Sequence, residues 1–197
     1  MEFHCSRDGR LNDQELPAAS ALRLNTLSDP DDLRVKAARA CLENSAWTDA
    51  KAELDQISFE GRNHPDVLDS RWVLAAKTGQ WKEALSVSEQ LCYRYPEHAE
   101  GWIFRATSFV ELSQYADAYQ VLRQGQERFP HDETIAYDLA CVCCALARLD
   151  EALNWIRKSI EIGGADSKRC ALEDGDLKPI ATQIQALPDA PLNPASS

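Results

Sequence analysis

One residue type recurs at a fixed interval along most of the chain. Each step between these alanines is 34 residues, and they are Ala50, Ala84, Ala118 and Ala152. An acid directly precedes each alanine, and a large apolar side chain stands three positions before it, at Trp47, Trp81, Tyr115 and Leu149. Three properties that stay in phase over four periods indicate an internal structural repeat. Such a chain is expected to fold as a stack of similar units.

Each period divides into two predicted helices. In the period that begins at Pro65, apolar residues from Leu68 to Ala76 have helical spacing. Gly79 then suits the left-handed backbone that commonly follows a helix, a second helix begins at Trp81, and Pro96 ends it. Two antiparallel helices approach closely only where side chains are small. The repeated alanines are therefore predicted to face the partner helix of each hairpin.

The 34-residue period, its Trp/Tyr-x-x-Ala core and its closing proline resemble the tetratricopeptide repeat. This resemblance implies an all-α fold, a right-handed superhelix of about four helix-turn-helix hairpins with a C-terminal capping helix. It covers residues 31–166, and the predicted units are 31–64, 65–98, 99–132 and 133–166. The first unit departs most from the pattern, because Phe59 or Gly61 can reshape its closing loop.

The two ends of the chain have different compositions from the repeats. Residues 1–30 are predicted as an N-terminal segment that is partly disordered or forms one short helix, from Leu16 to Leu27. Residues 188–197 are rich in proline and small residues, which predicts a disordered tail. A helical stack needs a cap for its last apolar face, and residues 167–187 are expected to provide it.

Within that capping region, Ser167 or Asp166 is expected to begin a short turn, and Asp174 or Asp176 to cap a last helix. The residues predicted to face the preceding repeat are Leu177, Ile180, Ile184 and Leu187. The stretch that runs from Tyr137-Asp138-Leu139-Ala140-Cys141 through Gly163-Gly164 to Ala171–Leu177 is similar to the closing segment of uncharacterised bacterial tetratricopeptide proteins, which often carry Asp-Pro-Asp-Leu where this chain has Asp-Gly-Asp-Leu. The resemblance implies a bacterial origin and an ordered C-terminal lid.

The charge balance bears on the class of partner. The chain has 21 Lys and Arg against 32 Asp and Glu, for a formal net charge of −11. A nucleic-acid partner and an anionic membrane surface are therefore not expected; a basic or apolar protein segment is more compatible. No apolar run reaches the length of a membrane span, and the N-terminus has no secretory signal pattern, so we expect a cytoplasmic protein.

Cys141-Val142-Cys143-Cys144 is the segment most suggestive of thiol or metal chemistry. Cys141 and Cys144 lie three residues apart on one helix face, but a zinc site usually needs four ligands and no second cysteine pair follows. Cys143 also falls at a repeat position that is predicted to be in the core. We interpret the segment as small apolar packing and expect no metal and no cofactor. A thiol or metal protein that uses Cys141 and Cys144 is kept as an alternative.

Other candidate chemistry is sparse. His64, His98 and His131 recur near the junctions between units, and equivalent loops of stacked repeats lie too far apart to share one metal. Capping or solvent exposure is the expected role of these histidines. The chain has no phosphate-binding glycine loop, no Gly-x-Ser-x-Gly segment and no His-Glu-x-x-His segment, so we expect no enzymatic activity.

The resemblance also implies a place for binding, since the first helix of each unit lines the concave surface in this family. The predicted peptide-binding positions are Val35, Arg39, Leu42, Asp69, Val73, Lys77, Ile103, Thr107, Val110, Tyr137, Cys141 and Cys144. Such a surface suits an amphipathic helix or an extended apolar segment. The predicted function is a protein–protein interaction adaptor or scaffold, monomeric or weakly self-associating. A dedicated chaperone for one secreted or assembly-prone client is the second hypothesis.

Overall fold

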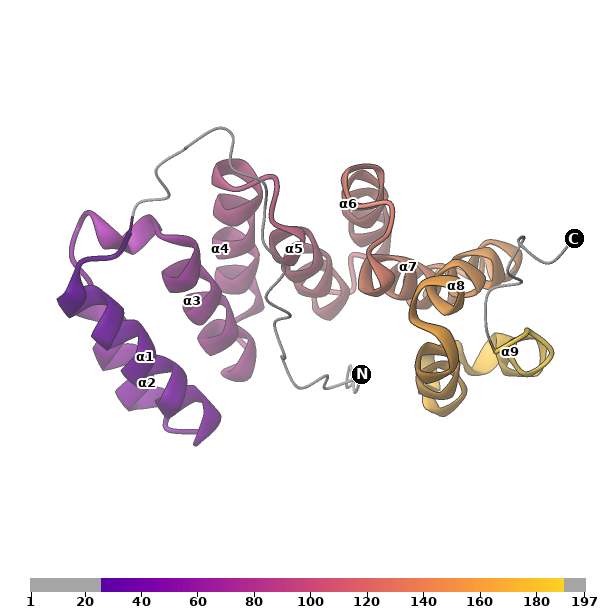
Figure 1. The fold of residues 1–197 in the computed structure, drawn as a ribbon, viewed down its shortest axis with the longest axis horizontal. Coiled ribbons are helices and arrows are strands. Elements are labelled where there is room, and N and C mark those ends of the chain that lie inside the picture. Colours follow the sequence, from indigo (N-terminus) through magenta and orange to yellow (C-terminus); the bar gives the residue numbers. More distant parts are fainter. Residues whose placement is uncertain (1–25, 190–197) are drawn as a thin grey trace, which may run out of the picture. The chain divides into compact units, whose positions relative to one another are not determined.

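The computed structural model describes residues 26–189, so the predictions for residues 1–25 and 190–197 lie outside the described part of the chain. Pairs of helices follow one another along the sequence (Figure 1). The first two pairs are α1 (Asp29–Glu43) with α2 (Trp47–Asp55), and α3 (Pro65–Lys77) with α4 (Trp81–Arg94). The next two are α5 (Ala99–Glu111) with α6 (Tyr115–Arg128), and α7 (Glu133–Ala145) with α8 (Leu149–Glu173). The prediction of an all-α fold made of helical hairpins is confirmed.

The chain divides into two compact units within α3, one ending at Leu74 and the other beginning at Ala75. In the first unit α1 packs on α2. In the second, α5 packs on α4 and α6, and α7 on α6 and α8. No helix in the described range 26–189 is long and apolar enough to cross a membrane.

The four repeated alanines each lie in a helix-packing interface. Ala50, Ala84, Ala118 and Ala152 are all 0% exposed. In the second unit, Ala118 belongs to a cluster with Leu122 and Leu139, and Ala152 to a cluster with Ile156. Any larger side chain would displace the facing helix, because protein interiors are close-packed. The prediction drawn from the 34-residue period is confirmed at this level.

The turn inside each hairpin has the same backbone geometry every 34 residues. The second residue after the first helix has a positive φ, of 58–70°, at Ser45, Gly79, Ser113 and Ala147. The next amide then donates to a carbonyl five residues back, as from Arg148 to Cys143 and from Gln114 to Phe109, both at 2.8 Å. This is the Schellman arrangement, which satisfies the last carbonyls of a helix. Gly79 is the position where the residue type matches that conformation without strain.

We expect Ala147→Gly to raise the free energy of unfolding by about 0.5–1 kcal/mol, because alanine is strained in the left-handed region. Gly79→Ala serves as the reciprocal control. No atom lies within 4 Å of the Cβ that it would add, so a loss of similar size would come from the backbone alone. Urea titration of both variants measures the two changes. Equal stability of Ala147→Gly and the wild type would contradict the expectation.

The first unit ends in a loop that differs from the others. A 3-10 turn, η1 (Gly61–Asn63), follows α2. The buried carboxylate of Asp31 accepts hydrogen bonds from the Ser58 amide (2.9 Å) and the Ser58 hydroxyl (2.5 Å), and these bonds lower its pKa. A Cβ on Gly61 would lie 2.5 Å from that carboxylate, so Gly61 is the residue that shapes this loop. Phe59 is exposed, with Arg62 over its ring.

The C-terminal region differs in detail from its prediction. The residues labelled α8 form two helical stretches separated at Gly164, where φ is 67° and ψ is −147°, and the second stretch ends at Glu173. Because this second stretch begins directly after Gly164, Asp166 and Ser167 lie within it and do not start it. The buried Ser167 hydroxyl pairs with that of Ser159 at 2.8 Å, and Asp166 pairs with Arg169. The chain then forms η2 (Gly175–Ile180) and α9 (Ala181–Gln185). The Asp174 side chain begins η2 by accepting the amide of Asp176 at 2.8 Å, one of the two caps that were expected.

Candidate binding surface

In the first unit, the predicted binding positions divide between the core and the surface. Val35 and Leu42 are buried, at 2% and 8% exposure. Arg39 is exposed and forms an ion pair with Asp66 of α3, with 2.7 Å between Nη2 and Oδ1. Asp69 and Val73 are half-buried. An ion pair between α1 and α3 thus involves Arg39, one of the predicted binding positions.

In the second unit, α5 presents two of its three predicted positions. Ile103 and Thr107 are half-buried, whereas Val110 is 5% exposed and packs in the cluster with Leu122. Lys77 is exposed at the end of α3. Ile103 and Thr107 are therefore the α5 side chains that a partner can contact.

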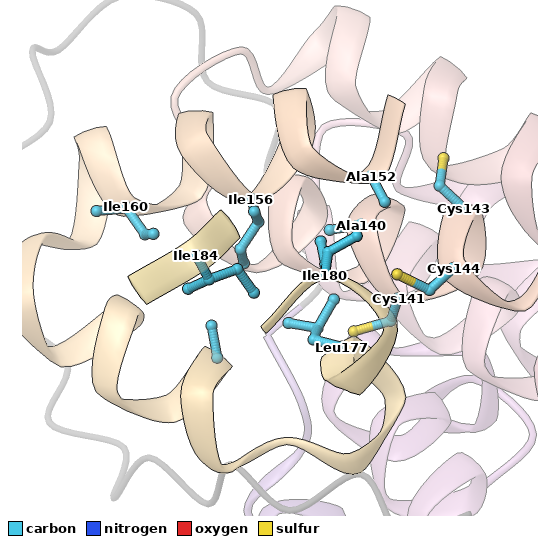
Figure 2. Packing of buried hydrophobic residues seen from close by; sticks show 11 residues of the cluster. Ala140, Cys141, Cys143, Cys144, Ala152, Ile156, Ile160, Leu177, Ile180 and Ile184 are labelled. Atoms are coloured by element: carbon cyan, nitrogen blue, oxygen red, sulfur yellow. The ribbon is translucent and has the colours of Figure 1, made fainter. Parts of the chain in front are cut away.

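The predicted positions on α7 are covered by the chain's own C-terminal segment. Cys141 and Cys144 are buried, at 4% and 9% exposure, in a cluster that also contains Leu177 of η2. Figure 2 shows Leu177 beside Cys141, and Ile184 beside Ile156. We leave the five buried residues, Val35, Leu42, Val110, Cys141 and Cys144, out of the candidate surface.

Tyr137 joins this C-terminal segment to α7. Its hydroxyl donates to Asp174 Oδ2 at 2.9 Å, and the ring is half-buried. Burial beside Cys141 and Asp174 raises the pKa of the Tyr137 phenol, so it stays a hydrogen-bond donor. Because the ring remains half-exposed, Tyr137 is both a contact for the closing segment and a surface residue.

The kink in α8 directs the chain back to α7. At Gly163 a Cβ would lie 2.1 Å from Glu133 Cδ, so the absent side chain makes room for the Glu133 carboxylate. Gly164 then takes the positive φ that redirects the backbone. The far end of the segment is held by Lys168, whose ammonium donates to the carbonyl of Leu187 and pairs with Asp189 at 2.7 Å.

Four carboxylates belong to α7, to η2 or to the residues that cap these helices: Asp132, Asp138, Asp174 and Asp176. Asp138 interacts electrostatically with Asp132 and Asp174, and Asp176 interacts with Asp174. Burial, then the charges of Asp132 and Asp174, raise the pKa of Asp138 to about 7. Burial and Asp174 raise the pKa of Asp176. Within residues 26–189 none of the four forms an ion pair with a lysine, arginine or histidine. This edge of the second unit is negatively charged.

The cysteine segment does not present reactive thiolates. Burial raises the pKa of the Cys143 thiol to about 12 and that of Cys144 to about 11, and it raises that of Cys141 well above its usual value. Metal ligation requires the thiolate. Cys143 is fully buried and points away from Cys141 and Cys144 (Figure 2). In the described range, no three or more His, Cys, Asp or Glu residues are grouped to hold a metal ion.

The three histidines at the junctions have separate local environments. His64 accepts a hydrogen bond from the amide of Asp66 through Nδ1 at 3.3 Å, next to the start of α3. The His98 ring lies 5.6 Å from the Tyr95 ring, and His131 is exposed. The capping role expected for these residues is met by His64.

Comparisons with known proteins give the fold its name. Residues 77–159 match the family described as "Anaphase-promoting complex, cyclosome, subunit 3". A MamA fragment from Desulfovibrio magneticus RS-1 superposes with a TM-score of 0.62 at 18% identity, over 82% of this chain and 97% of that one. A thermophilic TPR protein of Thermus thermophilus also has a TM-score of 0.62, at 17% identity, over 83% and 93% of the two chains. This chain has the tetratricopeptide repeat fold.

A further tetratricopeptide repeat protein, YrrB, superposes with a TM-score of 0.57 at 18% identity over 78% of this chain and 85% of that one. No curated protein matches the sequence. Identities at this level establish the shared fold. In the repeat frame, α1, α3, α5 and α7 are the first helices of their hairpins.

Two features of the candidate surface were missed from the sequence. Asp138 directly follows Tyr137 and was not among the predicted binding positions, although its carboxylate interacts with those of Asp132 and Asp174. The contact of Asp174 with Tyr137 was also not foreseen, although the Asp-Gly-Asp-Leu segment and the spacing of Leu177, Ile180 and Ile184 indicated an ordered closing element. Testing every polar residue adjacent to a predicted tetratricopeptide repeat groove position would have found Asp138.

Proposed function

We propose that this chain is a protein-interaction scaffold, and that its second unit binds a basic, partly apolar protein segment on the surface of α5 and α7. The observation that carries this proposal is the combination of half-exposed side chains, Ile103 and Thr107 on α5 and Tyr137 on α7, with four carboxylates that have no cationic partner in the described chain. Helices α5 and α7 contact each other. An apolar contact beside unpaired carboxylates suits a segment with lysine or arginine flanking apolar residues.

The comparisons support this class of function. YrrB is described as "a TPR protein with an unusual peptide-binding site". Tetratricopeptide repeat relatives of this kind act by binding, and the acidic charge of this chain agrees with a basic partner segment. We further propose that the protein works in the cytoplasm and has no catalytic role. An adaptor and a dedicated chaperone would use this surface in the same way and differ in the fate of the bound client.

The C-terminal segment limits how far the partner can extend along α7. Leu177 covers Cys141 and Cys144, and Asp174 holds the Tyr137 hydroxyl. The bound segment would therefore cross α5 and the start of α7, and its cations would meet Asp138 and Asp176 at the edge. This arrangement needs no movement of η2, so the ordering cost of binding falls on the partner.

A labelled peptide with alternating lysine and leucine residues tests the proposal by fluorescence anisotropy. Thr107→Lys with Asp176→Lys adds three positive charges to the surface and is expected to weaken binding by about tenfold or more, equivalent to about 1.4 kcal/mol. The matched control, Glu83→Lys with Gln90→Lys, adds the same charge to exposed positions of α4 and should change binding by less than about twofold. Equal losses in both variants, or no binding by the wild type, would contradict the proposed surface.

A further inference from the structure

A second surface of the same unit has a different composition. Three cations lie over two aromatic rings along α6 and α8. Arg123 Cζ is 5.2 Å and Lys158 Nζ is 5.6 Å from the centroid of the Trp155 ring, and Arg148 Cζ is 4.8 Å from that of Tyr119. We name these five residues, Tyr119, Arg123, Arg148, Trp155 and Lys158, the α6–α8 cation cluster. Its positive charge is local, because the chain as a whole carries −11.

One carboxylate, that of Glu151, lies within this cluster, and both of its oxygens contact cluster residues. Glu151 Oε1 accepts the Tyr119 hydroxyl and a long contact from Trp155 Nε1 at 3.5 Å, and Oε2 lies 3.9 Å from Arg148. In the part of the chain from 26 to 189, Arg123 and Lys158 have no carboxylate oxygen within 4.0 Å. Three cations against one carboxylate leave two positive charges in excess.

The contacts with aromatic rings also order these cations and leave their N–H groups available to bind an anion. A cation over an aromatic ring is attracted by the negative face of the ring. The N–H groups at the edge of a stacked guanidinium remain available for the paired hydrogen bonds that it forms with a carboxylate. Because Trp155 packs against the core, its ring is fixed, and the Arg123 and Lys158 side chains that contact it are partly ordered before any partner arrives. Prior ordering lowers the entropic cost of binding.

We propose that the α6–α8 cation cluster binds an acidic segment of a partner protein, with Arg123 and Lys158 pairing with its carboxylates. A nucleic acid carries negative charge along its whole length, so a strand that extends beyond this cluster is repelled by the remainder of this acidic chain. The proposed segment therefore has a few clustered Asp or Glu residues. This surface is separate from that of α5 and α7, which is proposed to take the opposite charge, so a scaffold with both could hold two partners at once.

The test uses the purified full chain and a fluorescein-labelled peptide of eight glutamates between glycine-serine ends. Anisotropy at 50 mM NaCl is expected to show saturable binding that weakens at 300 mM, where charges are more strongly screened. Arg123→Gln with Lys158→Gln should weaken binding by about tenfold. The control, Lys82→Gln with Arg157→Gln, removes the same charge from exposed positions that have no ring beneath them, and should bind within about twofold of the wild type.

Further measurements check the fold of the variants and distinguish an acidic peptide from a nucleic acid or a second copy of this chain as the ligand. Circular dichroism melting of both double variants checks that the fold is retained, and Arg123→Lys, which keeps the charge but loses the guanidinium fork, should bind with intermediate affinity. Three results would overturn the proposal: equal losses in the two double variants, tighter binding of an eight-nucleotide thymidine strand than of the glutamate peptide, or self-association in light scattering that the Arg123→Gln, Lys158→Gln variant abolishes. The last would make a second copy of this chain the occupant.

Discussion

Leu177→Ala is expected to lower the free energy of unfolding by about 3 kcal/mol, because the removal of a fully buried leucine side chain loses its apolar contacts and leaves a cavity. Leu177 of η2 is 0% exposed and packs with Cys141 and Ile180, and Figure 2 shows it beside Cys141 of α7. The cavity opens where the closing segment lies on α7. A loss of this size is a large fraction of the total stability of a small domain, so the variant should unfold at a clearly lower urea concentration.

A matched variant distinguishes the loss of the contact between Leu177 and α7 from the general effect of replacing a leucine with alanine. Leu172, near the end of α8, is 40% exposed, and Leu172→Ala should change the free energy of unfolding by less than about 1 kcal/mol. Thiol labelling under native conditions supplies a second readout, since loosening of η2 should expose Cys141 and Cys144 to reagent. If the two alanine variants have equal unfolding midpoints and equal labelling rates, η2 does not stabilise α7.

Asp138→Asn is expected to stabilise the protein at pH 8 and to leave it almost unchanged near pH 4. In the folded chain the pKa of Asp138 is raised to about 7, mainly by burial, against 3.8 without that environment. Between these values the folded chain binds more protons than the unfolded chain, so the free energy of unfolding falls as the pH rises from about 4 to about 7. Asparagine cannot ionise, and it removes this part of the fall.

The gain at pH 8 should be at least about 1 kcal/mol, since one pKa unit corresponds to about 1.4 kcal/mol. Urea unfolding at pH 4.5, 6 and 8 measures it. Asp166→Asn is the control, because Asp166 is exposed and pairs with the neighbouring Arg169, and the pH dependence of this variant should follow that of the wild type. If Asp138→Asn and the wild type lose stability in parallel from pH 4.5 to 8, the neighbourhood of Asp138 is not the source of the pH dependence.

The repeat-level architecture could be predicted from residues alone because its determinants are local and periodic. A small side chain every 34 residues, with helical spacing of apolar residues on both sides, predicts helical hairpins. The full burial of Ala84 and Ala118 agrees with this prediction. The turn geometry was visible at Gly79 alone. Ser113 and Ala147 adopt the same positive-φ backbone, because the hydrogen bonds of the Schellman turn outweigh the local strain. Serine and alanine do not favour this conformation, so their residue types did not predict it.

The candidate surface depended on which neighbours cover each helix. Helical phase placed Cys141 and Thr107 at equivalent positions, one period apart, yet Cys141 is buried under Leu177 and Thr107 is half-buried. The hydrogen bond from Tyr137 to Asp174 joins residues 37 apart, and the pKa of Asp138 responds to Asp174 across the same contact. Sequence periodicity by itself determined the helices, their pairing and the small residues between them. The kink at Gly164 and the return of the chain onto α7 decided which of those positions face solvent, because burial depends on long-range packing that no local pattern encodes.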